Sequence, residues 1–75
     1  MGLKELVRKH IDQYLEQLDG EIPQDLYDLV ISEVEHALLE ATLYQSTNNQ
    51  SRAAEMLGIS RGTLRTRMKL FGLLS

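Results

Sequence analysis

Residues 26 to 43 are apolar around more of the circumference of a helix than one partner helix can cover. An inner stripe repeats at helical spacing, and further apolar residues lie outside it: Ile31, Leu39 and Leu43. The run Leu29-Val30-Ile31 alone spans about 200° at 3.6 residues per turn. Soluble monomers rarely expose so large an apolar surface, so either a second copy of the chain or the C-terminal half folding back must cover it. We favour the second copy, which predicts a homodimeric four-helix core made by the first two helices of each protomer.

The N-terminal part of the chain is predicted to form two long helices. Apolar residues recur at steps of three and four over about 16 residues, which is typical of an amphipathic helix; they are Leu3, Leu6, Val7, Ile11, Tyr14, Leu15 and Leu18. Gly20 suits the left-handed position that ends a helix. Pro23, with its fixed φ and no N–H, is expected at the first position of a second helix that runs to Tyr44.

The C-terminal part is predicted to form two short helices after a polar connector, Ser46 to Gln50. The expected helices are residues 50–57 and 61–71. Gly58 can adopt positive φ at the turn between them, and Ser60 can cap the second of them. Gly72 is expected to close that last helix.

These segments predict an all-α fold with four helices per chain, because no alternating strand pattern is present. Residues 1–45 are interpreted as dimerisation helices and residues 49–75 as a helix-turn-helix unit, within one structural domain. A chain of 75 residues buries only about 60% of its unfolded surface, so a monomer would be marginally stable. The size therefore also favours a dimer.

Small and apolar residues in the last two helices have the spacing of a helix-turn-helix. Two helices that cross steeply need a small residue at their contact, here Ala54, and a glycine at the tight turn, here Gly58. Leu64 then faces back as an apolar anchor. The other residues interpreted as inward-facing are Ala53, Leu57, Ile59, Met68 and Phe71. Met56 is also interpreted as a core residue.

Charge is divided unevenly along the chain. Residues 1–45 carry three basic and ten acidic residues, whereas residues 46–75 carry five basic residues against Glu55 alone. A polyanion responds to the local field, which decays over roughly 8–10 Å at ordinary salt. The C-terminal part therefore suits a polyanion although the net charge of the whole chain is −3.

The outward face of the last helix is predicted to be basic. Arg61, Arg65 and Lys69 recur every four residues and so form one cationic row. Gly62, which has no side chain, permits a close approach to a sugar-phosphate backbone, and Thr66 completes this face. A helix of this kind fits the major groove of DNA, where arginine can bind guanine O6 and N7 together.

Residues 49–65, Asn-Gln-Ser-Arg-Ala-Ala-Glu-Met-Leu-Gly-Ile-Ser-Arg-Gly-Thr-Leu-Arg, closely resemble the C-terminal signature of the Fis family of bacterial, nucleoid-associated DNA-bending regulators. Residues 26–35 resemble the second helix of that family. The resemblance implies a cytoplasmic homodimer on the bacterial nucleoid that binds double-stranded DNA, with RNA polymerase as a candidate partner. It also implies recognition helices closer together than one DNA turn, so that the duplex bends and much of the site preference is indirect.

The resemblance further implies a set of DNA-contacting residues. Arg61 would contact a guanine, and Ser60 takes the place of an asparagine that touches bases in enteric members. The residues expected to contact or orient towards phosphate are Asn49, Ser51, Thr63, Arg65, Arg67 and Lys69, and the complete predicted interface also includes Arg52 and Thr66. Five basic residues per chain allow about ten phosphate contacts per dimer and a salt slope no steeper than about −9.

Three features depart from the family pattern. Ser60 is shorter than asparagine, so a base contact there is expected to be lost or bridged by water. Thr66 and Leu70 replace lysines, which predicts weaker or more salt-sensitive binding. The chain also begins almost at its first predicted helix, without the mobile N-terminal arm by which longer members stimulate site-specific recombinases, so that activity is not expected.

Catalysis and metal binding are not expected. The chain has no cysteine, which excludes disulfides and thiolate chemistry and fits a reducing cytosol. His10 and His36 have no partner at ligand spacing and are interpreted as ordinary surface histidines. The acidic residues, including Glu33 and Glu35, are interpreted as solvated groups that repel DNA from the wrong face. We therefore expect no enzyme, catalytic residue, metal, cofactor, small-molecule substrate or membrane association.

Two other functions stay open on the sequence. The chain could be the DNA-binding domain of an NtrC-type enhancer-binding activator, which shares this C-terminal helix-turn-helix. It could also be an acidic helical protein-interaction module that no longer binds DNA. In that case, alanine at Arg61 and Arg65 should leave partner binding unchanged, whereas a DNA-binding protein should lose its ligand.

Overall fold

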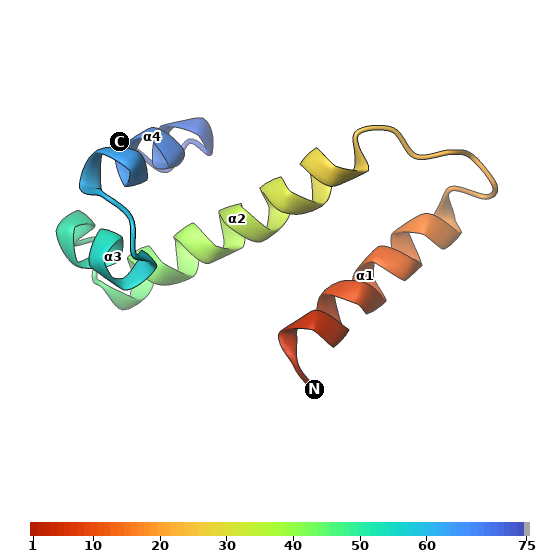
Figure 1. Ribbon diagram of the computed structural model, residues 1–75, viewed down its shortest axis with the longest axis horizontal. Helices are drawn as coiled ribbons and strands as arrows, with labels where there is room; N and C mark the ends of the chain where they lie inside the picture. Colours follow the sequence, from red (N-terminus) through yellow and green to blue (C-terminus); the bar gives the residue numbers. More distant parts are fainter. Residues whose placement is uncertain (75) are drawn as a thin grey trace. The chain divides into compact units, whose positions relative to one another are not determined.

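The computed structural model describes residues 1–74, which form four helices and no strand (Figure 1). The helices are α1 (Leu3–Gln17), α2 (Leu26–Gln45), α3 (Gln50–Leu57) and α4 (Arg61–Leu70). The predicted all-α fold with four helices is confirmed. None of the helices in this described range has the length and apolar character needed to cross a membrane.

The residues group into two compact units, and the boundary falls inside α2. The first unit is Met1–Ile31, and the second begins at Ser32. The second half of α2 therefore belongs with α3 and α4. The assignment of residues 1–45 to dimerisation and 49–75 to DNA binding is functional and stays a prediction.

The first unit has almost no core of its own. No residue of α1 is buried. Gly20 has a φ of 87° just after the end of α1, which confirms its predicted left-handed role, and Asp19 before it is also left-handed, with a φ of 52°. A helix of this length is marginal in water without packing of its apolar face, so α1 needs a partner surface.

The predicted start of the second helix at Pro23 is wrong. The helix begins at Leu26. Asp25 adopts a φ of 57°, in the left-handed region that aspartate tolerates better than most residues. The N–H of Leu29 donates to the carbonyl of Asp25 at 2.9 Å, and this bond starts the helix. Pro23 consequently lies in the preceding turn, because a left-handed residue separates it from the helix.

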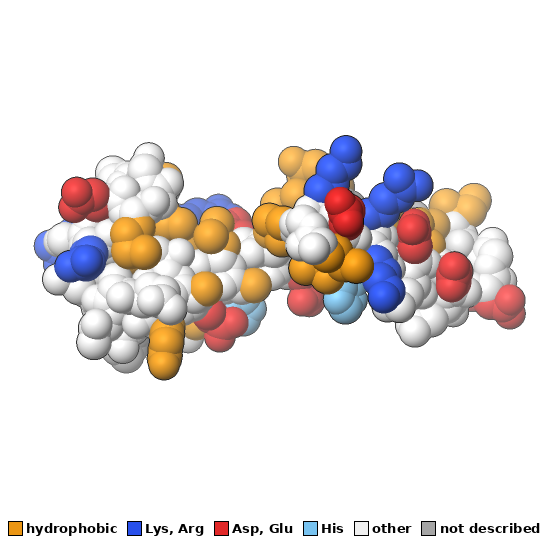
Figure 2. Space-filling model, turned by 90° about the horizontal axis from the view of Figure 1, so that it is seen from below, with side chains coloured by type: hydrophobic (Ala, Val, Ile, Leu, Met, Phe, Trp, Pro, Cys, Tyr) orange, Lys and Arg blue, Asp and Glu red, His pale blue; other side chains and the backbone are white. Residues whose placement is uncertain are grey.

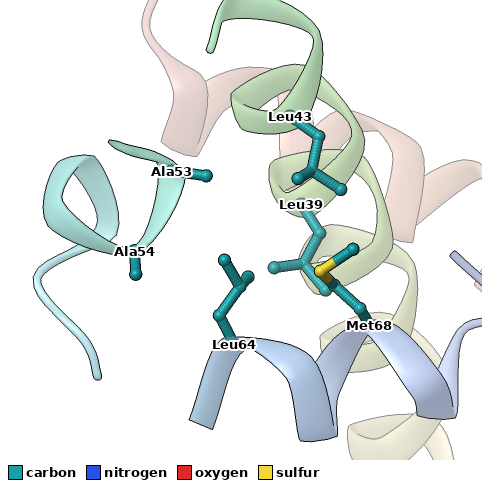
Figure 3. Packing of buried hydrophobic residues seen from close by; sticks show 6 residues of the cluster. All are labelled: Leu39, Leu43, Ala53, Ala54, Leu64 and Met68. Atoms are coloured by element: carbon teal, nitrogen blue, oxygen red, sulfur yellow. The ribbon is translucent and has the colours of Figure 1, made fainter. Parts of the chain in front are cut away.

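The core of the second unit lies where α3 and α4 pack against the C-terminal end of α2. Figure 3 shows side chains from all three helices converging. Leu64, the predicted anchor, is fully buried, and the predicted contact residue Ala54 is also buried. The complete buried cluster is Leu39, Leu43, Ala53, Ala54, Leu64 and Met68, with Leu57, Ile59, Phe71, Leu73 and Leu74 packed against it. The C-terminal part therefore covers Leu39 and Leu43.

Left-handed residues end the two C-terminal helices as predicted. Gly58 has a φ of 74° and Gly72 a φ of 69°. After α4, the N–H of Leu73 donates to the carbonyl of Met68 at 2.9 Å, and that of Gly72 to Lys69 at 3.2 Å. This pair of bonds is a Schellman motif, which satisfies the last carbonyls of the helix.

Several apolar residues that α3 and α4 do not cover remain exposed. Met56 is 54% exposed, so its interpretation as a core residue is wrong; it sits on the outer side of α3. Figure 2 shows apolar side chains, in orange, among the charged ones at the surface. The exposed large apolar residues of the first two helices and the turn between them are Leu3, Leu6, Tyr14, Leu15, Ile22, Tyr27, Leu29, Ile31, Val34, Leu38 and Tyr44. They include all three tyrosines.

Candidate nucleic-acid interface

The predicted outward face of α4 is exposed along its whole length. Every one of its predicted residues is solvent-exposed: Arg61, Gly62, Arg65, Thr66 and Lys69. Leu64 and Met68, on the opposite side of the helix, are buried. This division follows from the 3.6-residue period, which separates the basic row from the anchoring residues. The residue pattern therefore predicted correctly which face of α4 is exposed and which is buried.

Ser60 caps α4, as predicted. Its hydroxyl oxygen accepts a hydrogen bond from the N–H of Thr63 at 3.0 Å and donates to the hydroxyl oxygen of Thr63 at 2.8 Å. Because Ser60 donates its hydrogen within the cap, the hydroxyl hydrogen of Thr63 is free to bind an acceptor outside the protein. Of these two neighbours, Thr63 is thus the better donor to a phosphate.

The start of α3 presents a second cap of the same kind. The side-chain oxygen of Asn49 accepts a hydrogen bond from the N–H of Arg52 at 3.0 Å. This bond uses the amide oxygen and leaves the NH₂ group of Asn49 available as a donor. Asn49, Ser51 and Arg52 are all exposed. Donors at helix N-termini, together with the helix dipole, favour anions such as phosphate.

One hydrogen bond links the basic row to the start of α3. A guanidinium nitrogen of Arg65 donates to the side-chain oxygen of Gln50 at 2.7 Å. Gln50 was not among the predicted interface residues, because only the folded chain brings positions 50 and 65 together. The bond holds Arg65 beside the first turn of α3, so that both helices contribute to one polar surface.

Arg67 differs from the other basic residues of α4. Its guanidinium donates two hydrogen bonds to the carboxylate of Glu35 on α2, each 2.5 Å long. The hydrogen bonds from Arg67 lower the pKa of Glu35 below its ordinary value, and the carboxylate raises the pKa of Arg67. Glu35 is therefore not merely the solvated acid that the sequence suggested. It pairs with a residue predicted to contact phosphate.

Thr66 also has an internal partner. Its hydroxyl donates to the carbonyl of Gly62 at 3.1 Å, one turn earlier in α4. A hydroxyl that bonds back to its own helix in this way must rotate before it can donate elsewhere. A phosphate contact by Thr66 would therefore break this bond. Arg61 and Lys69 have no such competing partner, since neither forms an ion pair with another described residue.

The two histidines lie in different surroundings. His36 stacks on Phe71 with ring centroids 5.1 Å apart and lies 3.8 Å from the carboxylate of Glu40. His10 is exposed on α1. Among residues 1–74 no group of three or more histidine, aspartate, glutamate or cysteine side chains is arranged to hold a metal ion.

The geometry defines a helix-turn-helix protein with a basic outer helix and two capped helix N-termini on the polar side. The description of the family model that matches residues 30–71 is "Bacterial regulatory protein, Fis family". The match covers most of α2 and the whole of α3 and α4. It thus includes every contact described above for the polar surface.

Similarity to individual relatives extends over both long helices as well. The chain is 48% identical over 71 residues to the DNA-binding protein Fis of Glaesserella parasuis, covering 95% of this chain and 72% of the relative. It is 49% identical over 71 residues to that of Actinobacillus succinogenes and 48% identical to that of Haemophilus influenzae, with the same coverage. The chain therefore belongs to the Fis family of bacterial regulatory proteins.

Proposed function

We propose that the protein is a homodimeric, nucleoid-associated regulator that binds double-stranded DNA and bends it. The observation that carries the proposal is the exposed row of Arg61, Arg65 and Lys69 on a helix whose opposite face is anchored in the core. A helix of this kind can enter the major groove with its N-terminal residues against base edges. Relatives that match 95% of the chain are named DNA-binding protein Fis, which favours this function over the two alternatives.

The proposed DNA contacts are of two kinds: contacts to base edges, which read the sequence, and contacts to phosphate, which position the protein on the duplex. Arg61, at the start of α4, is assigned to a guanine in the major groove. Donors at the two helix starts are assigned to phosphate, which fixes the register of the protein on the duplex. They are Asn49, Ser51, Arg52 and Thr63, with Arg65, Lys69 and the weaker candidates Ser60 and Thr66 completing the set.

Dimerisation is supported by the apolar residues that the single chain leaves exposed. Leu29, Ile31, Val34 and Leu38 are each at least 40% exposed on α2, and α1 has no buried residue. Complete burial of such a side chain contributes about 1.5–3 kcal/mol, and covering the part still exposed here contributes a fraction of that. A four-helix core formed by α1 and α2 of two protomers would cover them together and would present two copies of α4 to one duplex.

The proposal assigns no reaction to this protein. We assign no catalytic role to the acidic residues of α1 and α2 or to the two histidines. Regulation would act through DNA in the bacterial cytoplasm, by bending a promoter and by bringing RNA polymerase into contact with the bound dimer. DNA that bends easily, at pyrimidine–purine steps, should be preferred at positions the protein does not touch.

Binding to a short duplex with an AT-rich centre tests the proposal directly. Gel shifts at two salt concentrations should give discrete complexes that weaken as salt rises, with a slope no steeper than about −9. Circular permutation of the site should then show a bend. No complex at low salt, from protein shown to be folded and dimeric, would overturn the DNA-binding function and leave a protein-interaction module.

Replacing two of the exposed apolar residues on α2 should dissociate the dimer. In Val34→Lys/Leu38→Lys, each protomer loses two apolar contacts and would have to bury two charges, which costs several kcal/mol. Sedimentation at micromolar concentration should show a monomer. The matched control is Leu70→Lys, because Leu70 is 65% exposed on α4 and outside the proposed core; that variant should stay dimeric. A double variant that remains dimeric would contradict the proposed interface.

Gly62→Ala should stabilise the protein while weakening its binding to DNA. A Cβ at this position would meet nothing within 4 Å in the free protein, and alanine in a helix is favoured over glycine by about 0.5–1 kcal/mol. Thermal unfolding should shift upwards by a few degrees. The methyl group would nevertheless stand where α4 approaches the sugar-phosphate backbone. Unchanged affinity in a gel shift would show that no close approach occurs there.

A further inference from the structure

Arg67, unlike Arg65 and Lys69, is held by an acidic residue of α2. Its guanidinium forms two hydrogen bonds with Glu35, and the pair is partly buried, with side chains 40% and 23% exposed. Parallel hydrogen bonds between arginine and a carboxylate fix both planes and are among the stronger polar contacts in proteins. A phosphate contact by Arg67 would have to break both bonds. It would also leave the Glu35 carboxylate unpaired.

A second contact lies at the C-terminal cap of α4, four residues after Arg67. His36, next to Glu35 on α2, stacks on Phe71, which follows Arg67 by four residues. The two rings are 5.1 Å apart between centroids with an interplanar angle of 24°. Two adjacent residues of α2 therefore hold α4 at Arg67 and at its C-terminal cap, Phe71. Together, Glu35–Arg67 and His36–Phe71 form a clamp between the helices.

We propose that Arg67 is a positioning residue, which through this clamp fixes the orientation of α4 on α2 and thereby the bend imposed on DNA. The proposal rests on the proposed function, in which α2 belongs to the dimer core and α4 enters the groove. In such a dimer, the distance between the two copies of α4 depends on how each is attached to its α2. Arg67 then contributes no phosphate contact of its own.

The variant Glu35→Gln separates this role from a phosphate contact by the sign of its effect. If Arg67 bound phosphate, removing the competing carboxylate would free a cation and tighten DNA binding. If Arg67 positions α4, the same change loosens the clamp. We expect binding to weaken by at least about twofold, the lower end for contacting pairs, and the measured bend to change. Glu33→Gln removes the same charge from an exposed position of α2 and should alter neither.

The salt dependence of binding gives a second, independent comparison. Without Arg67, four basic residues per chain remain, and the slope for the dimer should be no steeper than about −7. Arg67→Gln should leave the wild-type slope unchanged, whereas Lys69→Gln should reduce its magnitude by about 2, since each dimer loses two contacts. Equal reductions in both variants would overturn the positioning role.

A measurement without DNA keeps the inference testable even if no duplex is bound. The chain has no cysteine, so Ser32→Cys/Leu70→Cys places one spin label on α2 and one on α4. With labelled chains diluted in unlabelled protein, the distance distribution should be narrow in an otherwise wild-type chain and broader with Glu35→Gln. An unchanged distribution with Glu35→Gln would overturn the clamp. Absence of DNA binding with a broadened distribution would instead overturn only the proposed function.

Discussion

Arg61→Ala should abolish discrete complexes with DNA at salt concentrations where the wild-type protein forms them. Arg61 is the first residue of α4, is exposed, and has no ion pair with another described residue. A bidentate contact with guanine discriminates by about 1–3 kcal/mol. Because a dimer makes the contact twice, the affinity should fall about 30-fold or more. Gel shifts on a duplex with guanines at the edges of the site would measure this.

Two further variants separate base reading from charge. Arg61→Lys keeps the positive charge but cannot bind O6 and N7 through a planar fork. It should retain the salt slope of the wild type and lose most of the affinity for the guanine-containing site. Arg8→Ala removes an exposed arginine of α1, paired within that helix to Asp12 at 3.9 Å, and should have no effect. If Arg61→Ala bound as tightly as Arg8→Ala, α4 would not be the reading helix.

The helix-turn-helix could be predicted in detail because its determinants are close together in the sequence. Ala54, Gly58 and Leu64 each perform the role that their spacing indicated: small contact, left-handed turn and buried anchor. Ser60 caps α4 for a similarly local reason, since its partner is three residues away. Where spacing along one helix decides which face is buried, the residue pattern alone is enough.

The errors have physical causes of two kinds. At Pro23, two rules competed: proline suits the first turn of a helix, but Asp25 enters the left-handed region and delays the start to Leu26. At Met56, hydrophobicity was taken as burial, although an isolated exposed apolar side chain is common. Neither case could be decided from the residue pattern, because each depends on how the neighbouring segments of the chain fold.

Contacts between distant segments were missing from the prediction altogether. Glu35 and Arg67 are 32 positions apart, and nothing in either helix indicates that one faces the other. The same holds for Gln50 and Arg65. The residue pattern therefore predicted the outward residues of α4 correctly as a set, but the prediction assigned Arg67 to phosphate together with Arg65 and Lys69. The structure distinguishes cations that are free from one already paired.

The wide apolar band of α2 is only partly covered within one chain. Leu39 and Leu43 are covered by α3 and α4, whereas Val34 and Leu38 stay exposed for the proposed second protomer. The two solutions weighed from the sequence are therefore complementary rather than exclusive, because folding back of the C-terminal part covers only one end of the band. One continuous helix then joins the core that holds α4 to the face proposed for dimerisation.

Leu64→Ala should unfold the helix-turn-helix at temperatures where the wild-type protein is stable. Leu64 is 0% exposed, at the meeting point of α2, α3 and α4 (Figure 3). Truncating a buried leucine costs about 2–5 kcal/mol, a large part of the stability of a domain this small. Thermal unfolding should shift down by 10 °C or more, roughly as expected for this size, and amides of α3 and α4 should exchange faster. Leu70→Ala, on the same helix but 65% exposed, should change stability by no more than about 0.5 kcal/mol. Equal stabilities of the two variants would contradict the three-helix core, because burial is the property that distinguishes these two leucines.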